Sequence, residues 1–240
     1  MSQHASDLAQ QAGHHEKAAL FATRLALWQA FFGNASAARH TASAALEQAP
    51  NREVQFGAAF ALALSDDSAR SQALTDELQR SYPEDTSVRF TYLPALRGLL
   101  ALERHDPSAA LVQLETAAPY EISSPRSAIN AFLGALYPVF VRGQACLAAH
   151  QGAEAATTEF PTILDRPGIT IGDPISALAH LGLARAYAVE AADAKLTSDA
   201  QQSFRAKART AYNDFLTLWK DADSGIPILK QAKVEWAKLQ

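Results

Sequence analysis

The 240-residue sequence lacks features on which several protein classes depend. Cys146 is its only cysteine, which excludes an internal disulfide and a zinc site built from several cysteines. No apolar run approaches the roughly 20 residues that span a bilayer. The start, MSQHASDLAQQAGHHEK, has no apolar core of a secretion signal. We therefore expect a cytoplasmic chain without membrane insertion. Behind a membrane segment in a longer parent protein, the same chain would be displayed outside the cytoplasm.

Strong charge of one sign and catalytic motifs are also scarce. The net charge is -4 and the charges are scattered, which disfavours nucleic acid as a partner. There is no Gly-rich phosphate loop, no kinase His-Arg-Asp or Asp-Phe-Gly motif and no Gly-x-Ser-x-Gly motif. His14 and His15 are adjacent and would point to different sides of a helix, so they do not form a metal pair. Cys146 and His180 lie in apolar runs and are expected to pack in the core. We expect a non-catalytic chain with no cofactor and no metal.

Alanine and leucine, which are strong helix formers, are abundant instead. Apolar residues recur at helical spacing, for example at Phe204, Ala208, Ala211 and Phe215. Breaks fall near FGNAS (32–36), LSDDS (64–68) and RHDPS (104–108), among others. The pairs Asp106-Pro107 and Asp173-Pro174 are typical helix starts, because Asp accepts free amide protons and Pro has none to donate. The pattern predicts an all-α fold of about eleven helices.

A phrase of the sequence occurs twice, as YLPALRG at 92–98 and YPVFVRG at 137–143. Pro50 and Pro83 end successive helix pairs 33 residues apart, and a period near 34 is typical of the tetratricopeptide repeat (TPR). We therefore predict a single TPR-like domain, 1–240, formed by a superhelical stack of antiparallel helix hairpins. Its expected units are approximately 15–50, 51–84, 86–119, 125–165 and 174–220, followed by a capping helix at 226–239.

Small residues are expected where the two helices of a pair cross. Gly98 and Ala110 are twelve residues apart, and so are Gly143 and Ala155. A small side chain on each helix allows the two backbones to approach.

Three longer runs resemble a known family. They are YLPALRGLLALERHDPSAALVQLETAAPYE, LYPVFVRGQACLAAHQGAEAATTEF, and DPISALAHLGLARAY with AYNDFLTLWKDADSGIPILKQAKVEWAKL. They are similar to the C-terminal TPR region of bacterial serine/threonine protein kinases, of the kind common in acidobacteria, and of some winged-helix regulators. The resemblance implies a sensory or docking part of a larger signalling protein. It does not imply kinase activity in this chain.

A TPR stack would place a mixture of aromatic, amide and guanidinium side chains along a concave groove. The candidate binding residues are Phe56, Phe60, Tyr92, Tyr137, Phe140, Gln144 and Arg185. Their alternative role is packing between repeats. Arg97 and Arg142, from the repeated phrase, either bridge neighbouring repeats or hold an acidic ligand group.

We expect a scaffold for protein–protein interaction, whose partner is a protein, a peptide or another domain of its own parent chain. The alternative is a self-association module that forms a weak homo-oligomer through Trp28, Phe31 and Phe32. An enzyme on a helical-repeat scaffold is the third hypothesis.

Overall fold

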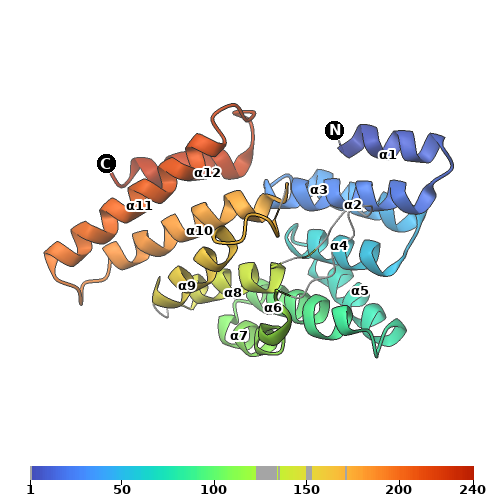
Figure 1. The fold of residues 1–240 in the computed structure, drawn as a ribbon, viewed down its shortest axis with the longest axis horizontal. Helices are drawn as coiled ribbons and strands as arrows, with labels where there is room; N and C mark the ends of the chain where they lie inside the picture. Colours follow the sequence, from blue (N-terminus) through green and yellow to red (C-terminus); the bar gives the residue numbers. More distant parts are fainter. Residues whose placement is uncertain (1, 123–133, 135, 150–152, 171) are drawn as a thin grey trace. The chain divides into compact units, whose positions relative to one another are not determined.

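The computed structural model describes residues 2–122, 134, 136–149, 153–170 and 172–240, with side chains for all of these except 2 and 153–156. These residues form twelve α-helices and no β-strand, which confirms the all-α prediction (Figure 1). The helices are α1 (Ser2–Gln11), α2 (His15–Phe31), α3 (Ala35–Gln48), α4 (Arg52–Ala63), α5 (Ser68–Ser81), α6 (Leu93–Glu103), α7 (Pro107–Glu115), α8 (Tyr137–Ala148), α9 (Ala153–Leu164), α10 (Pro174–Ala191), α11 (Ser198–Leu218) and α12 (Pro227–Ala237). A π-helical segment, Val88–Tyr92, leads into α6, and a 3₁₀ turn, Ala118–Tyr120, follows α7.

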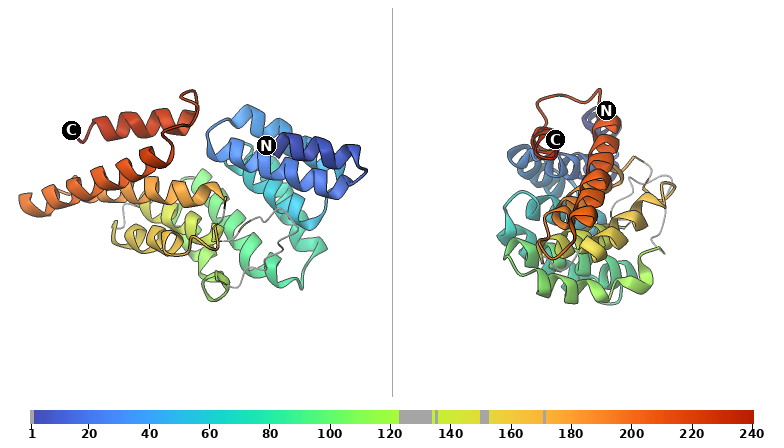
Figure 2. Two further views of the ribbon diagram at one scale, coloured as in Figure 1. Left: turned by 45° about the horizontal axis from the view of Figure 1, so that its top comes forward. Right: turned by 90° about the vertical axis from the view of Figure 1, so that its left-hand side faces the viewer.

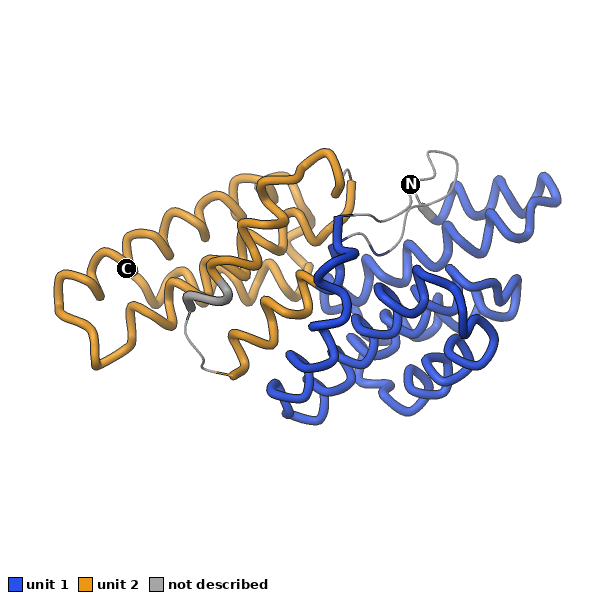
Figure 3. Tube along the Cα trace, turned by 60° about the horizontal axis from the view of Figure 1, so that its bottom comes forward, with its two compact units in different colours: residues 1–138 blue, residues 139–240 orange. Residues whose placement is uncertain are grey.

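The chain divides into two compact units, residues 1–138 and 139–240, and the division falls inside α8 (Figure 3). In the first unit, α2 packs on α3, α4 on α5 and α6 on α7. In addition, α2 packs on α4 and α4 on α6, so the first helices of the three hairpins form a row. The hairpins lie in the ranges expected for the first three repeats. The additional helix α1, which packs on α2, lies before the first expected repeat unit. A superhelical TPR stack over 1–240 stays a prediction.

The turns within the hairpins α2–α3, α4–α5 and α6–α7 of the first unit share one backbone geometry. Residues Gly33, Asp66 and His105 each have a positive φ, of 86°, 60° and 58°. In each turn, the amide of the next residue donates to the carbonyl five residues earlier, at 2.8–3.0 Å. This bond satisfies a free carbonyl at the end of the preceding helix, as in a Schellman motif. The breaks predicted at 32–36, 64–68 and 104–108 therefore have the same turn conformation.

Asp side chains start the following helices, as predicted. The Asp106 carboxylate accepts from the Ala109 amide at 2.9 Å at the start of α7. Asp173 accepts from the Ile175 amide at 3.1 Å at the start of α10. Each bond satisfies an amide that has no partner within its own helix.

The predicted glycines do lie at close contacts between paired helices, but their partners differ from those expected. A Cβ atom placed on Gly98 would lie 3.0 Å from Leu114 of α7. One placed on Gly143 would lie 2.8 Å from the Phe160 ring of α9. Ala110 is buried, while the side chain of Ala155 lies outside the described residues. Each contact therefore joins a glycine to a large side chain, because a ring or a leucine fills the gap that a missing Cβ leaves.

In the second unit, α10 and α11 form the longest hairpin, and α12 lies beside α11 (Figure 2). The expected unit 174–220 is longer than the period near 34, and its additional residues include 190–205. The structure uses those residues to extend both helices, leaving only the turn from Ala192 to Thr197. The cap helix α12 buries Leu229 and Ala232. Among the described residues, no helix has both the length and the apolar composition that a membrane span requires.

Candidate functional site

Four of the seven candidate groove residues meet in the core of the first unit. Phe56 stacks on Tyr92 with ring centroids 3.9 Å apart and planes within 8°. Phe60 lies 4.8 Å from Tyr137, which also meets Phe31 edge-on at 5.6 Å. The two tyrosines of the repeated phrase thus converge on the two phenylalanines of α4. Their exposed fractions are between 0 and 6 %. The expectation that these rings line an open groove is not met, because they pack against one another between neighbouring helices.

Gly134 belongs to the same cluster and was not identified from the sequence. Its φ is +91°, and a Cβ atom there would lie 2.6 Å from the Phe56 ring. Both observations favour glycine, which alone combines this backbone conformation with such close approach. A single glycine in a long connection offers no pattern that distinguishes it.

The other three candidates lie in the second unit and have separate surroundings. Phe140 is buried, with its ring centroid 6.3 Å from that of Phe160. Gln144 is half-buried on α8. Arg185 of α10 forms a two-point ion pair with Glu235 of α12, through Nε at 2.9 Å and Nη2 at 3.0 Å. The Tyr212 hydroxyl donates to the same carboxylate at 3.0 Å. Arg185 therefore holds the cap helix and is not directed at an open groove.

The equivalent arginines of the repeated phrase make different bridges. Arg142 of α8 pairs with Glu159 of α9 at 2.7 Å, within one helix pair. The Arg97 Nη2 donates to the Gln79 Oε1 of α5 at 2.6 Å, linking α6 to the preceding hairpin. Bridging between neighbouring repeats, one of the two roles considered, is thus observed for Arg97, whereas Arg142 pairs within a single hairpin.

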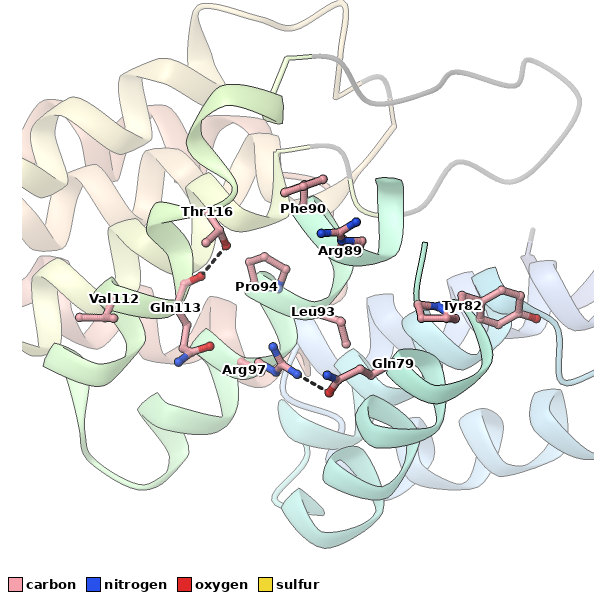
Figure 4. Close-up of a pocket in the computed structure, with 11 residues that line it drawn as sticks. Gln79, Tyr82, Arg89, Phe90, Leu93, Pro94, Arg97, Val112, Gln113 and Thr116 are labelled. Carbon is pink, nitrogen blue, oxygen red and sulfur yellow. Dashed lines mark hydrogen bonds between the residues drawn. The ribbon is translucent and has the colours of Figure 1, made fainter. Parts of the chain in front are cut away.

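A surface pocket of about 540 Å³ lies between α5, α6 and α7, beside Arg97 (Figure 4). We call it the α5–α7 pocket. Its lining residues are Gln79, Tyr82, Pro83, Arg89, Phe90, Leu93, Pro94, Arg97, Val112, Gln113 and Thr116. Buried Leu93 and Pro94 of α6 contribute apolar surface, and Val112 of α7 is exposed at 60 %. Of this set, only Arg97 was expected from the sequence to contact a ligand, while Pro83 was expected to end a helix. The available signal for this pocket was Val112, an apolar residue on the outer face of α7.

Aromatic and cationic groups fix one side of this pocket. The Phe90 ring stacks on Tyr120 with centroids 4.2 Å apart. The Arg89 guanidinium lies 5.2 Å from the Phe90 centroid, within the range of a cation–π contact, and 3.2 Å from the Glu84 carboxylate. The stack holds Phe90 in place as a wall of the α5–α7 pocket.

Of the two titratable groups discussed from the sequence, Cys146 is buried and His180 is half-buried. Burial raises the pKa of the Cys146 thiol, and the Glu159 carboxylate adds to this shift. Thiolate, the reactive form, is therefore disfavoured. Burial lowers the pKa of His180, which Asp214 partly opposes. Within the described ranges, no three His, Cys, Asp or Glu side chains form a group that could hold a metal ion.

Comparison with known proteins gave no match to a protein-family model, to a curated protein or to a solved structure. The resemblance to TPR regions of signalling proteins therefore rests on the sequence runs alone.

Proposed function

We propose that the chain is a non-catalytic protein-interaction module that docks a partner in the α5–α7 pocket, as the docking part of a larger bacterial signalling protein. The pocket is the observation that carries this proposal. It combines apolar surface from Leu93, Pro94 and Val112 with the polar ends of Arg97 and Gln113. Interaction sites characteristically place a few hydrogen-bonding groups around an apolar centre.

This proposal keeps the docking function expected from the sequence and changes its location. The aromatic residues first considered are buried, whereas the α5–α7 pocket opens to solvent through Gln79, Val112 and Thr116. The row of hairpins in the first unit supports the proposal, because stacked helical repeats create extended binding surfaces. The similarity to TPR regions of kinases supports the signalling context.

Affinity capture from a lysate of the source organism tests the proposal with three baits. These are the unchanged chain, Val112→Asp in the pocket and Val234→Asp on α12. The two valines are almost equally exposed, at 60 % and 58 %, so the second variant is a matched control. We expect a partner retained by the unchanged chain and by Val234→Asp, and reduced at least tenfold on Val112→Asp. Equal recovery on all three baits would remove the pocket from the function.

Self-association remains the alternative function, but its expected surface is not open. Phe31 is buried and contacts Phe60 and Tyr137 in the core. Trp28 and Phe32 are only partly exposed, and the Arg24 guanidinium lies 4.9 Å from the Trp28 ring centroid. These residues therefore offer little apolar area to a second copy.

A further inference from the structure

We infer that the α5–α7 pocket takes an extended acidic segment of a partner protein, in which a carboxylate lies close to a branched aliphatic side chain. This inference rests on the proposed docking function and adds the chemistry of the partner. The first observation in its support is the charge of the residues that line the pocket. The eleven lining residues include Arg89 and Arg97 and no Asp or Glu, although the whole chain has 25 acidic and 21 basic residues. A locally positive pocket on an acidic chain selects a negatively charged group.

Arg97 is the group best prepared to bind a carboxylate. Within the described part of the chain it is paired with no carboxylate, and its hydrogen bond goes to the neutral Gln79 amide. That bond orients the guanidinium without neutralising it. A guanidinium presents two parallel N–H groups, which match the two oxygens of a carboxylate. Figure 4 shows Arg97 and Gln79 together at one side of the pocket.

Arg89 adds a second positive charge that a ligand can share. Its side chain is exposed at 48 %, and its partner Glu84 is exposed at 88 %. An ion pair this open to solvent is weak, so a better-placed carboxylate can replace Glu84.

The apolar part of the pocket selects the neighbouring side chain. The apolar lining residues are the exposed Val112 and the buried Leu93 and Pro94, and an aliphatic side chain of the partner would cover part of this apolar surface. Five lining residues are themselves exposed, namely Gln79, Pro83, Arg89, Val112 and Thr116. Sites for small molecules enclose most of the ligand, whereas an open pocket suits one or two side chains of a larger partner. Two arginines are also too few for the basic stripe that nucleic acid requires.

Selection from a random eight-residue peptide display library on the full chain tests this inference. We expect enriched peptides with Asp or Glu within two positions of Leu, Ile or Val. Recovery should fall at least tenfold on Arg97→Gln and less than twofold on Arg80→Gln. Arg80 is a control on α5 that lies outside the pocket and is exposed at 72 %. Replacing the acid of a synthetic enriched peptide by its amide should weaken binding at least tenfold in fluorescence anisotropy.

The possible results separate the inference from the function beneath it. Enriched peptides that are neutral or basic, yet lost on Val112→Asp, would overturn the acidic chemistry and leave the docking function. Acidic peptides that bind Arg97→Gln as well as the unchanged chain would overturn the role of this pocket in binding them. If no peptide is enriched on the unchanged chain relative to the Val112→Asp variant, both the acidic chemistry and the docking function are overturned. Thermal unfolding of each variant shows that the fold is retained before binding is compared.

Discussion

Phe160 of α9 shows how single residues set the packing of the second unit. Its ring is fully buried and touches two glycines on different helices. A Cβ atom on Gly143 of α8 would lie 2.8 Å from the ring, and one on Gly182 of α10 only 2.4 Å. Because Gly143 and Gly182 have no side chain, α8 and α10 can both pack closely against the Phe160 ring of α9.

Gly182→Ala tests this packing. A helical Gly→Ala change by itself stabilises by about 1 kcal/mol, but the added methyl group overlaps a ring that cannot leave the core. Overpacking typically costs about 1–3 kcal/mol, so we expect a lower free energy of unfolding in urea titration. Gly168→Ala is the control, since an added Cβ there meets nothing within 4 Å. A gain of about 1 kcal/mol at Gly182, the value for a helical Gly→Ala change without a clash, would show that the ring can move aside.

Tyr92 predicts a pH dependence of stability. Burial, with a smaller contribution from Glu53, raises the pKa of its hydroxyl to about 12, whereas an unfolded tyrosine titrates near 10. Between these values the folded chain holds a proton that the unfolded chain releases. The Tyr92 contribution is therefore fully present below about pH 10 and declines above it, by up to about 1.4 kcal/mol per pH unit. We expect Tyr92→Phe to flatten the fall in unfolding free energy between about pH 10 and pH 12. An unchanged slope would exclude Tyr92 as its source.

At the scale of elements, the helix hairpins of the first unit depend on a shared turn with different residues. Gly33 adopts the positive φ without steric cost, whereas Asp66 and His105 adopt it with a side chain present. The Asp side chains at 67 and 106 then cap the next helix through the amides of Arg70 and Ala109. Asp66 and His105 therefore adopt a left-handed conformation that is unfavourable for residues with a side chain. In both turns the next residue is an Asp that caps the following helix.

Two substitutions of opposite sign test this account of the turns. His105→Gly should stabilise the protein by about 0.5–1 kcal/mol, because relief of the left-handed conformation exceeds the added backbone entropy. Gly33→Ala should destabilise it by about 1 kcal/mol for the reverse reason. Urea unfolding of both variants measures the two changes. The same sign for both would contradict a common backbone geometry.

At the scale of the whole molecule, the described surface has exposed aliphatic side chains but little exposed aromatic area. Leu8, Val112, Ile122, Val189, Leu218 and Val234 are the exposed large hydrophobic residues among those described. They belong to separate elements along the chain, and Val112 alone lines the α5–α7 pocket. This distribution favours a local docking site over a broad self-association face.

Light scattering on the full chain tests this conclusion. We expect the mass of one chain at every concentration between micromolar and hundreds of micromolar, because Phe31 is in the core and Trp28 is partly covered. A mass that rises with concentration would restore the self-association hypothesis. A repeat with Val112→Asp would then show whether the α5–α7 pocket is the contact.

The sequence by itself determined the features that depend on neighbours in the chain. Helical periodicity, Asp caps such as Asp106 and Asp173, and breaks such as 104–108 are local, because the groups that interact are a few residues apart. The repeated phrase likewise marked two related helices. The α1 helix lies before the first predicted unit, which was placed at 15–50 from the repeat period.

Only the tertiary structure decided which side of each helix is covered. Tyr92 and Tyr137 had the composition of a binding surface, yet both meet Phe56 or Phe60 in the core. Gly143 was predicted to lie at a close contact between helices, but its partner Phe160 was not predicted. Phe160 meets both Gly143 and Gly182 because α8, α9 and α10 come together at this point. The α5–α7 pocket arises in the same way, from Gln79, Arg97 and Val112 on separate helices. Such contacts join residues far apart in the chain, and spacing along a single helix carries no information about them.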